Sequence, residues 1–218
     1  MKINKPYTLY ENANRPVIGT VSAPVIQEDG CIFKDSARTG KLLPYEDWRL
    51  DAKTRAKDLA SRLSVTEIAG LMMYSPHQMV PSLPGEPFAA TYGGKPFPES
   101  GAQPWELTDQ QKTLLQQDHI RHILAMKLES AEVAASWSNA MQQAAEELPW
   151  GIPVNISSDP RHGASKAGAE FKSGGGDVSK WPEGLGIAAT FSPEVCRDFA
   201  NAISKEYRAL GITTALSP

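Results

Sequence analysis

Residues able to do chemistry gather directly after one apolar run. Residues 151–156 are typical of a buried strand, and Asp159 follows that run closely. A carboxylate at the carboxyl end of a parallel strand can accept short, charge-assisted hydrogen bonds from a ligand. Arg161 and His162 come next and could support Asp159 or line a pocket. The alternatives stay open: Asp159-Pro160 also fits a simple turn, and the other two fit a loop arginine and a structurally hydrogen-bonded histidine.

A second group lies around Trp181. An indole face is a natural platform for a flat or cyclic ligand, but a tryptophan just before a helix is more often a core residue. Nearby, residues 174–177 (Gly-Gly-Gly-Asp) resemble a phosphate-binding loop. They lack the Gly-Lys-Ser/Thr ending and a preceding strand, so we interpret them as a flexible loop.

Residues 35–46 match the frame of a calcium-binding loop. Asp35, Gly40 and Glu46 occupy the first, sixth and twelfth positions of such a loop. Ala37 and Thr39 stand at the third and fifth positions, where at least one carboxylate-type ligand is lost. We therefore predict a degenerate loop that keeps the turn geometry and no metal site.

The elements that must position these residues alternate between helices and strands. Short extended runs at 17–21 and 31–33, with a turn signal at 28–30, indicate a hairpin in an irregular leader, 1–47. The turn and cap signals then predict two helices after Asp51 and Ser64 and a Pro-rich connection without secondary structure over 76–104. Strands and helices follow in alternation, and this order predicts parallel βα units. Their expected ranges are 107–118 (helix), 122–126 (strand), 130–148 (helix), 151–156 (strand), 193–210 (helix) and 212–216 (strand).

Composition narrows the class of protein. The chain has 218 residues, a hydrophobic fraction of 41% and a formal net charge of −3, which is an ordinary globular composition. It has no clustered basic footprint for nucleic acid and no apolar run long enough for a membrane span. Its two cysteines suggest neither a zinc site nor a disulfide framework. No signal peptide is visible, so the expected location is cytoplasmic, or secreted or periplasmic if a leader was removed.

Three stretches together resemble the N-terminal domain of glycoside hydrolase family 3, the group of β-glucosidases and related exo-acting enzymes. They are 58–67 (DLASRLSVTE), 151–163 (GIPVNISSDPRHG) and 181–194 (WPEGLGIAATFSPE), the last followed by a long helix and Ala-Leu-Gly-Ile. Their order and spacing cover about 48–218. The resemblance implies an α/β fold of the TIM-barrel type, with about the first half of the barrel present after the N-terminal extension at 1–47.

The resemblance also implies a function. Asp159 would accept hydrogen bonds from sugar hydroxyls, with Arg161, His162 and Trp181 as further substrate-binding residues. The reaction would be retaining hydrolysis of a β-glycoside by water, which needs two carboxylates and no organic cofactor. In the family, the nucleophilic aspartate and the acid/base glutamate come from later segments, so this chain alone is expected to be catalytically silent.

Two alternatives come from other classes. A non-catalytic half-barrel could bind sugar or assemble with itself or a second chain, because it leaves a strand edge and an apolar interior uncovered. A different barrel hydrolase could use Asp159, Asp177 or Glu183 as its own carboxylate pair.

Overall fold

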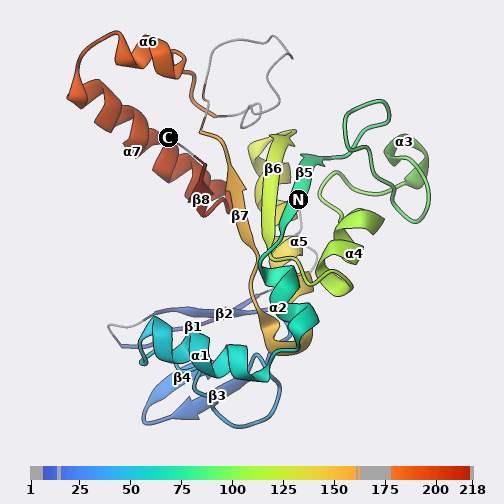
Figure 1. Ribbon diagram of the computed structural model, residues 1–218, viewed down its shortest axis with the longest axis vertical. Helices are drawn as coiled ribbons and strands as arrows, with labels where there is room; N and C mark the ends of the chain where they lie inside the picture. The colour runs from blue at the N-terminus through green and yellow to red at the C-terminus, as the bar shows by residue number, and fades with distance from the viewer. Residues whose placement is uncertain (1–6, 14–15, 161, 163–177, 217–218) are drawn as a thin grey trace.

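Two units make up the chain, a small N-terminal β unit and a parallel sheet with helices packed on it (Figure 1). The structure, a computed structural model, describes residues 7–13, 16–160, 162 and 178–216. The sequence predicts the second unit as an α/β fold, and the parallel sheet confirms that class.

The N-terminal unit contains two antiparallel strand pairs. Strand β1 (Thr8–Tyr10) pairs with β2 (Ile18–Thr20), and β3 (Val25–Glu28) pairs with β4 (Cys31–Lys34). The turn expected at 28–30 is present, with positive φ at its two central residues, a conformation that matches strand twist. The expected pairing of 17–21 with 31–33 is wrong, because the adjacent segment β3 reaches β4 through a two-residue turn.

An aromatic cluster forms the centre of this unit. Phe33 is fully buried, the Trp48 ring stacks on it at 5.1 Å, and the Arg49 guanidinium lies 4.8 Å from its centroid. The Trp48 indole also donates to the carbonyl of Ile32 at 3.0 Å. The extension is therefore held by stacking and by a cation–π contact rather than by a large apolar core.

Helices α1 (Ala52–Arg62) and α2 (Val65–Leu71) begin where the cap signals predict. The Asp51 carboxylate accepts from two first-turn amides of α1. Ser64 and Glu67 form a reciprocal capping box at the start of α2. These caps satisfy amide donors that a helix cannot satisfy itself, which explains why both helix starts are readable from the sequence.

The first strand of the parallel sheet, β5 (Tyr74–Val80), falls inside the expected Pro-rich connection. The prediction of no secondary structure over 76–104 is wrong for this part and for the short helix α3 (Phe97–Ser100). Pro76 lies at a shift in the register between β5 and β6. There the Leu124 amide donates to the Ser75 hydroxyl at 3.0 Å, so a side chain replaces a backbone acceptor. A proline is tolerated because β5 is an edge strand.

The remaining elements alternate as the sequence predicts, although the last two strands are shorter than expected. These elements are α4 (Asp109–Gln116), β6 (His122–Leu128), α5 (Ala131–Glu146), η1 (Pro149–Gly151), β7 (Asn155–Ser158), α6 (Gly184–Ala188), α7 (Pro193–Leu210) and β8 (Thr214–Ala215). The strands pair in parallel in the order β5-β6-β7-β8. Within the described part of the chain the sheet is open, so no closed barrel is formed.

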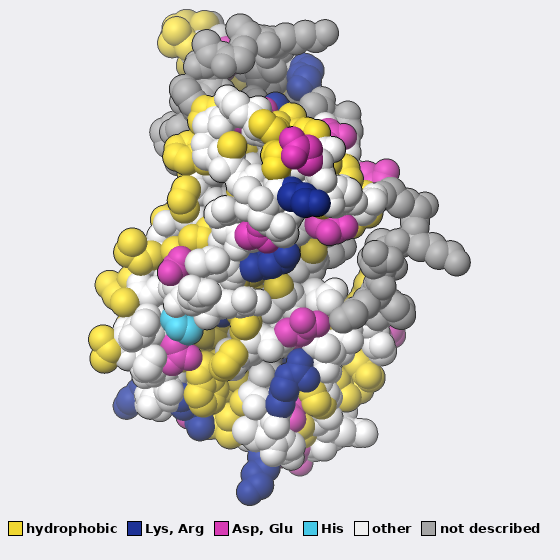
Figure 2. All heavy atoms as spheres, turned by 90° about the vertical axis from the view of Figure 1, so that its right-hand side faces the viewer, with side chains coloured by type: hydrophobic (Ala, Val, Ile, Leu, Met, Phe, Trp, Pro, Cys, Tyr) yellow, Lys and Arg dark blue, Asp and Glu magenta, His cyan; other side chains and the backbone are white. Residues whose placement is uncertain are grey.

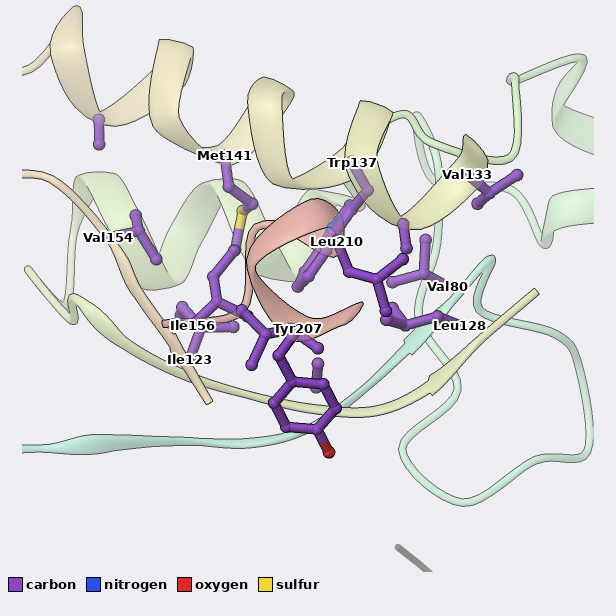
Figure 3. Packing of buried hydrophobic residues seen from close by; sticks show 14 of the residues in the cluster. Val80, Ile123, Leu128, Val133, Trp137, Met141, Val154, Ile156, Tyr207 and Leu210 are labelled. Carbon is purple, nitrogen blue, oxygen red and sulfur yellow. The ribbon is translucent and has the colours of Figure 1, made fainter. Parts of the chain in front are cut away.

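Helices α5 and α7 pack on one face of the sheet (Figure 3). Met141 of α5 lies over Ile123 and Ile156 of the strands, and Trp137 of α5 lies beside Leu210 of α7 (Figure 3). All five side chains are buried in one cluster. Gly211 ends α7 in the left-handed conformation, where a Cβ would lie 2.0 Å from the Ser138 hydroxyl of α5. Only glycine satisfies both the positive φ and this close approach of the two helices.

The opposite face carries a row of polar side chains across the strands. Tyr74 stacks on His122 at 6.0 Å, and His122 Nδ1 lies 3.3 Å from the Asn155 amide nitrogen. The side-chain Oδ1 of Asn155 accepts from the Thr214 hydroxyl at 2.8 Å. One face of the sheet is thus an apolar core under helices, and the other begins with a hydrogen-bonded polar layer.

The surface mixes charges of both signs. Figure 2 shows acidic and basic side chains interspersed over one face of the molecule. Among the residues that the structure describes, no helix has the length and apolarity needed to cross a bilayer.

One carboxylate joins the two units. Glu146, in the last turn of α5, is 7% exposed, and its Oε1 accepts the amides of Val21, Ser22 and Ala23 at 2.7–2.9 Å. Its Oε2 lies 2.8 Å from the Lys34 ammonium. A negative charge at a helix C-terminus is normally unfavourable, so these four donors explain its presence there.

The same contacts set the protonation of Glu146. Burial raises the pKa of this carboxyl, but the Lys34 ammonium and the three amides outweigh burial and lower the pKa to about 2. From the ordinary value of 4.5, this shift corresponds to about 3 kcal/mol of stabilisation by the ionised form, at about 1.4 kcal/mol per pKa unit.

Replacing Glu146 by glutamine tests this link. Because the folded-state pKa lies below the unfolded one, the stabilisation is present above about pH 4.5 and is lost as the pH falls toward about 2. We expect Glu146→Gln to lower the free energy of unfolding by about 3 kcal/mol at neutral pH. The difference from the parent protein should shrink steadily in urea titrations below about pH 4. Glu147→Gln, at the exposed neighbour, is the control, and equal losses in both variants would contradict the prediction.

Candidate functional site

The candidate site lies at the carboxyl ends of the parallel strands. Strand β7 ends at Ser158 and Asp159 follows it directly. Asp159 is 9% exposed. The register of β7 with β6 and β8 brings the carboxyl ends of these neighbours to the same edge of the sheet. In α/β folds of this kind, this edge is where binding residues collect.

The backbone at Asp159 is held from both sides. Ser158 donates its hydroxyl to the Ala125 carbonyl of β6 at 2.7 Å. Tyr207 of α7 donates its hydroxyl to the Asp159 carbonyl at 2.6 Å. Tyr207 is buried, and that burial raises the pKa of its phenol to about 12, so it stays a proton donor at any physiological pH.

His162 lies in the same cluster, below the surface. Its side chain is fully buried, and Nε2 lies 2.9 Å from Oε2 of Glu206 on α7. Its ring is tilted against Tyr207 at 5.5 Å and meets the edge of Phe199 at 6.1 Å. Burial lowers the pKa of this imidazole, and the Glu206 carboxylate opposes that effect.

Trp181 joins His162 through the backbone. The Trp181 amide donates to the His162 carbonyl at 2.7 Å, and its indole Nε1 donates to the Ser179 hydroxyl at 2.9 Å. The half-buried ring packs on Phe199 at 5.4 Å. Asp159, His162 and Trp181 therefore all lie along α7, beside the stretch from Phe199 to Tyr207.

Other residues singled out in the sequence fall elsewhere. Arg161, Asp177 and the glycine run at 174–176 lie outside the described residues. Glu183 is exposed at the N-terminus of α6.

Two residues of the cluster were not among the sequence candidates. Glu206 and Tyr207 contact residues that follow β7 and residues that precede α6. The helical pattern identifies Tyr207 only as part of the buried face of a helix. In the sequence, Glu206 is visible only as a glutamate next to the buried face of an amphipathic helix. Such a position is typical of a charge exposed to solvent.

The calcium-like loop at 35–46 has its own internal hydrogen bonds. The Asp35 carboxylate accepts the amides of Thr39 and Gly40 at 2.9 and 2.8 Å. The Glu46 carboxylate accepts the amides of Ala37 and Leu43 at 2.8 and 3.0 Å. Both carboxylates are buried and act as acceptors for the loop backbone. Across the described ranges, no group of three or more His, Cys, Asp or Glu side chains is arranged to hold a metal ion.

Comparison with known proteins identifies the family. The model of the "Glycosyl hydrolase family 3 N terminal domain" matches residues 91–218, more than half of the chain and all of the cluster around α7. The chain belongs to glycosyl hydrolase family 3. The resemblance found in the sequence is thereby confirmed, and the open parallel sheet is part of a domain whose family fold is a TIM-like barrel.

Relatives in this family are β-glucosidases by name. A "Periplasmic beta-glucosidase/beta-xylosidase" of Dickeya chrysanthemi is 39% identical over 204 residues, which cover 93% of this chain and 28% of that protein. "Beta-glucosidase C" of Emericella nidulans is 31% identical over 75% of this chain and 23% of that protein. The chain thus spans about a quarter of the length of the curated relatives it matches. The name of the Dickeya protein does not support the cytoplasmic location expected from the sequence and is compatible with the secreted or periplasmic alternative.

The hydrogen bonds of loop 35–46 generate a prediction about stability and calcium. We expect Asp35→Asn to lower the free energy of unfolding by about 1–3 kcal/mol, because a buried charged acceptor for two amides is lost. About 1 mM calcium should leave the melting temperature of the parent protein unchanged, because amides already occupy the carboxylate oxygens.

The exposed Asp118, changed to asparagine, is the matched control for the loss of charge. Calorimetric titration showing calcium binding in the micromolar range, or an Asp35→Asn variant as stable as the parent, would overturn this description of the loop.

Proposed function

We propose that this chain is the N-terminal part of a retaining, exo-acting glycoside hydrolase of the β-glucosidase type. Its substrate would be a β-glycoside, with water as the second substrate and no organic cofactor. The whole protein would act outside the cytoplasm, as the name of the Dickeya relative states for that protein. The observation that carries the proposal is the position of Asp159, at the carboxyl end of β7 and inside the matched domain.

In this proposal, Asp159 holds the sugar and does not attack it. A carboxylate fixed at a strand end can accept two hydroxyl hydrogen bonds and set the orientation of a sugar ring. The Tyr207 contact to its carbonyl and the Ser158 contact to β6 favour such a fixed position. Arg161, His162 and Trp181 would complete the pocket, His162 through its position beside Asp159 and Trp181 through its half-exposed ring.

The two reacting carboxylates would come from segments after residue 218, as in the family. Retaining hydrolysis needs a nucleophile and an acid/base about 5–5.5 Å apart. We assign neither role to a residue of this chain.

An alternative is a non-catalytic half-barrel that binds sugar or pairs with another chain. The observation that favours it is the open sheet, because β5 and β8 each lack a strand partner on one side within the described residues. Size-exclusion chromatography with light scattering separates the two cases: a stable dimer of the 218-residue chain supports assembly, and a well-behaved monomer argues against it.

Catalytic silence of the isolated chain is the first test. We expect the purified 218-residue protein to release no chromophore from aryl β-glucosides or β-xylosides, and a longer protein carrying this segment to hydrolyse them. The control is the longer protein with its downstream aspartate and glutamate candidates changed to alanine. Turnover by the 218-residue chain at ordinary enzyme rates of about 1–1000 per second would show that the carboxylates are misplaced.

The role of Asp159 is the second test, made in the longer protein. Asp159→Asn keeps the size of the side chain and removes its charge, so we expect kcat/KM to fall about 10- to 100-fold. Asp118→Asn, at an exposed aspartate just after α4, should leave kcat/KM unchanged. If Asp159→Asn retains parental kcat/KM, Asp159 is only a turn residue and the sugar-contact assignment is wrong.

A further inference from the structure

A single turn of α7 holds the chain on both sides of the candidate sugar site. Tyr207, 3% exposed, donates to the Asp159 carbonyl at 2.6 Å. The preceding residue, Glu206, contacts two other segments with its two carboxylate oxygens. Adjacent residues on one helix thus reach the start and the end of the segment that runs from β7 to α6.

The two oxygens of Glu206 have different partners. Oε1 accepts the backbone amide of Ser179 at 3.1 Å. Oε2 lies 2.9 Å from Nε2 of His162, whose side chain is fully buried. The two atoms lie within ion-pair distance but outside hydrogen-bond geometry, so the contact is electrostatic and is attractive when the imidazole is protonated.

A backbone hydrogen bond joins His162 to Trp181. The His162 carbonyl accepts the Trp181 amide at 2.7 Å, so the residues after Asp159 and the residues before α6 are joined directly. The His162 ring also lies against Phe199 and Tyr207 of α7. The side-chain contacts all come from α7, and the backbone bond between His162 and Trp181 links the two segments that they hold.

A purely structural need for packing would not explain this arrangement. A buried imidazole beside a carboxylate costs desolvation, and apolar residues of similar volume usually give equal or better stability. A carboxylate that bonds two separate segments instead fixes their relative position, which apolar packing specifies less sharply. That property is useful at Asp159, because this proposed ligand-binding carboxylate directly follows strand β7.

We propose that Glu206 is a positioning residue for the sugar site: by holding His162 and Ser179 together, it fixes the backbone that presents Asp159 and Trp181. The sugar-positioning part of this inference rests on the proposed function, whereas the anchoring of the backbone does not. Glu206 touches no sugar in this scheme and acts through His162 and the Ser179 amide.

Amide hydrogen exchange on the 218-residue chain tests the anchoring. We expect Glu206→Ala to accelerate exchange at the Ser179 and Trp181 amides by about tenfold or more, because a charged acceptor is lost. Glu206→Gln keeps a carbonyl oxygen for the Ser179 amide, so exchange at Ser179 should be partly restored while the His162 contact is changed. Asp198→Asn, at an exposed aspartate of the same helix, is the control and should leave both amides as in the parent.

Kinetics in the longer protein test the positioning of the sugar. We expect Glu206→Gln to lower kcat/KM for an aryl β-glucoside about tenfold, with melting temperature measured in parallel to separate positioning from lost stability. In the double variant with Asp159→Asn, the loss of kcat/KM should be smaller than the sum of the two single losses, because both changes act on the same sugar contact. Tyr207→Phe, which removes the second anchor without removing charge, should give a loss of the same kind.

The exchange experiment and the kinetic experiment can each contradict a different part of the proposal. Unchanged exchange at Ser179 and Trp181 in Glu206→Ala overturns the anchoring, whatever the enzyme assay gives. Accelerated exchange with parental kcat/KM in Glu206→Gln and Tyr207→Phe overturns the sugar-positioning role and leaves a structural clamp. A longer protein that hydrolyses no β-glycoside refutes the proposed function and with it the sugar role, while the exchange result still decides the anchoring.

Discussion

The carboxylate of Glu146 is the contact on which the arrangement of the two units depends. It ends α5, whose other residues form the centre of the apolar core over the parallel sheet, and it binds three consecutive amides of the N-terminal extension. The described residues of the extension pack around Phe33 and form no large apolar core. The position of the extension depends on this buried ion, together with the Tyr45 hydroxyl, which donates to the Trp150 carbonyl at 3.1 Å. Arg38 strengthens this junction, because its guanidinium donates to the Ser22 carbonyl and hydroxyl beside the same amides.

Local signals made much of the fold predictable. The caps at Asp51 and Ser64 are used in the structure as their spacing indicates, because a cap involves atoms only two or three residues apart. Strand β5 was missed because Pro76 and a Pro-rich continuation argue against a strand, and the compensation comes from Ser75 and from its place at the edge of the sheet. The hairpin partner of β4 was missed for a related reason. A two-residue turn selects the nearest segment, although 17–21 has the stronger β pattern.

The candidate site also contains residues that the sequence could predict and residues that it could not. Asp159 could be found because it follows a strand in a contiguous motif, and the family match places that motif in a known domain. Glu206 could not be found because its two partners, His162 and Ser179, are distant from it in sequence and meet it only after α7 packs on the sheet. Pair contacts of this long-range kind leave no periodic pattern. The same is true of Glu146, whose amide partners lie more than a hundred residues away.

Pro76 has a consequence for solubility. An edge strand with regular, unpaired amides and carbonyls invites other chains to add strands, which leads to aggregation. In β5 the proline carries no amide hydrogen, and the neighbouring register shift bends the ladder at the same place. An unrelated strand would meet a gap in its hydrogen bonding there, whereas a strand with a matching irregularity could still pair. Pro76, which led the sequence analysis to miss β5, thus also disfavours indiscriminate pairing at this edge.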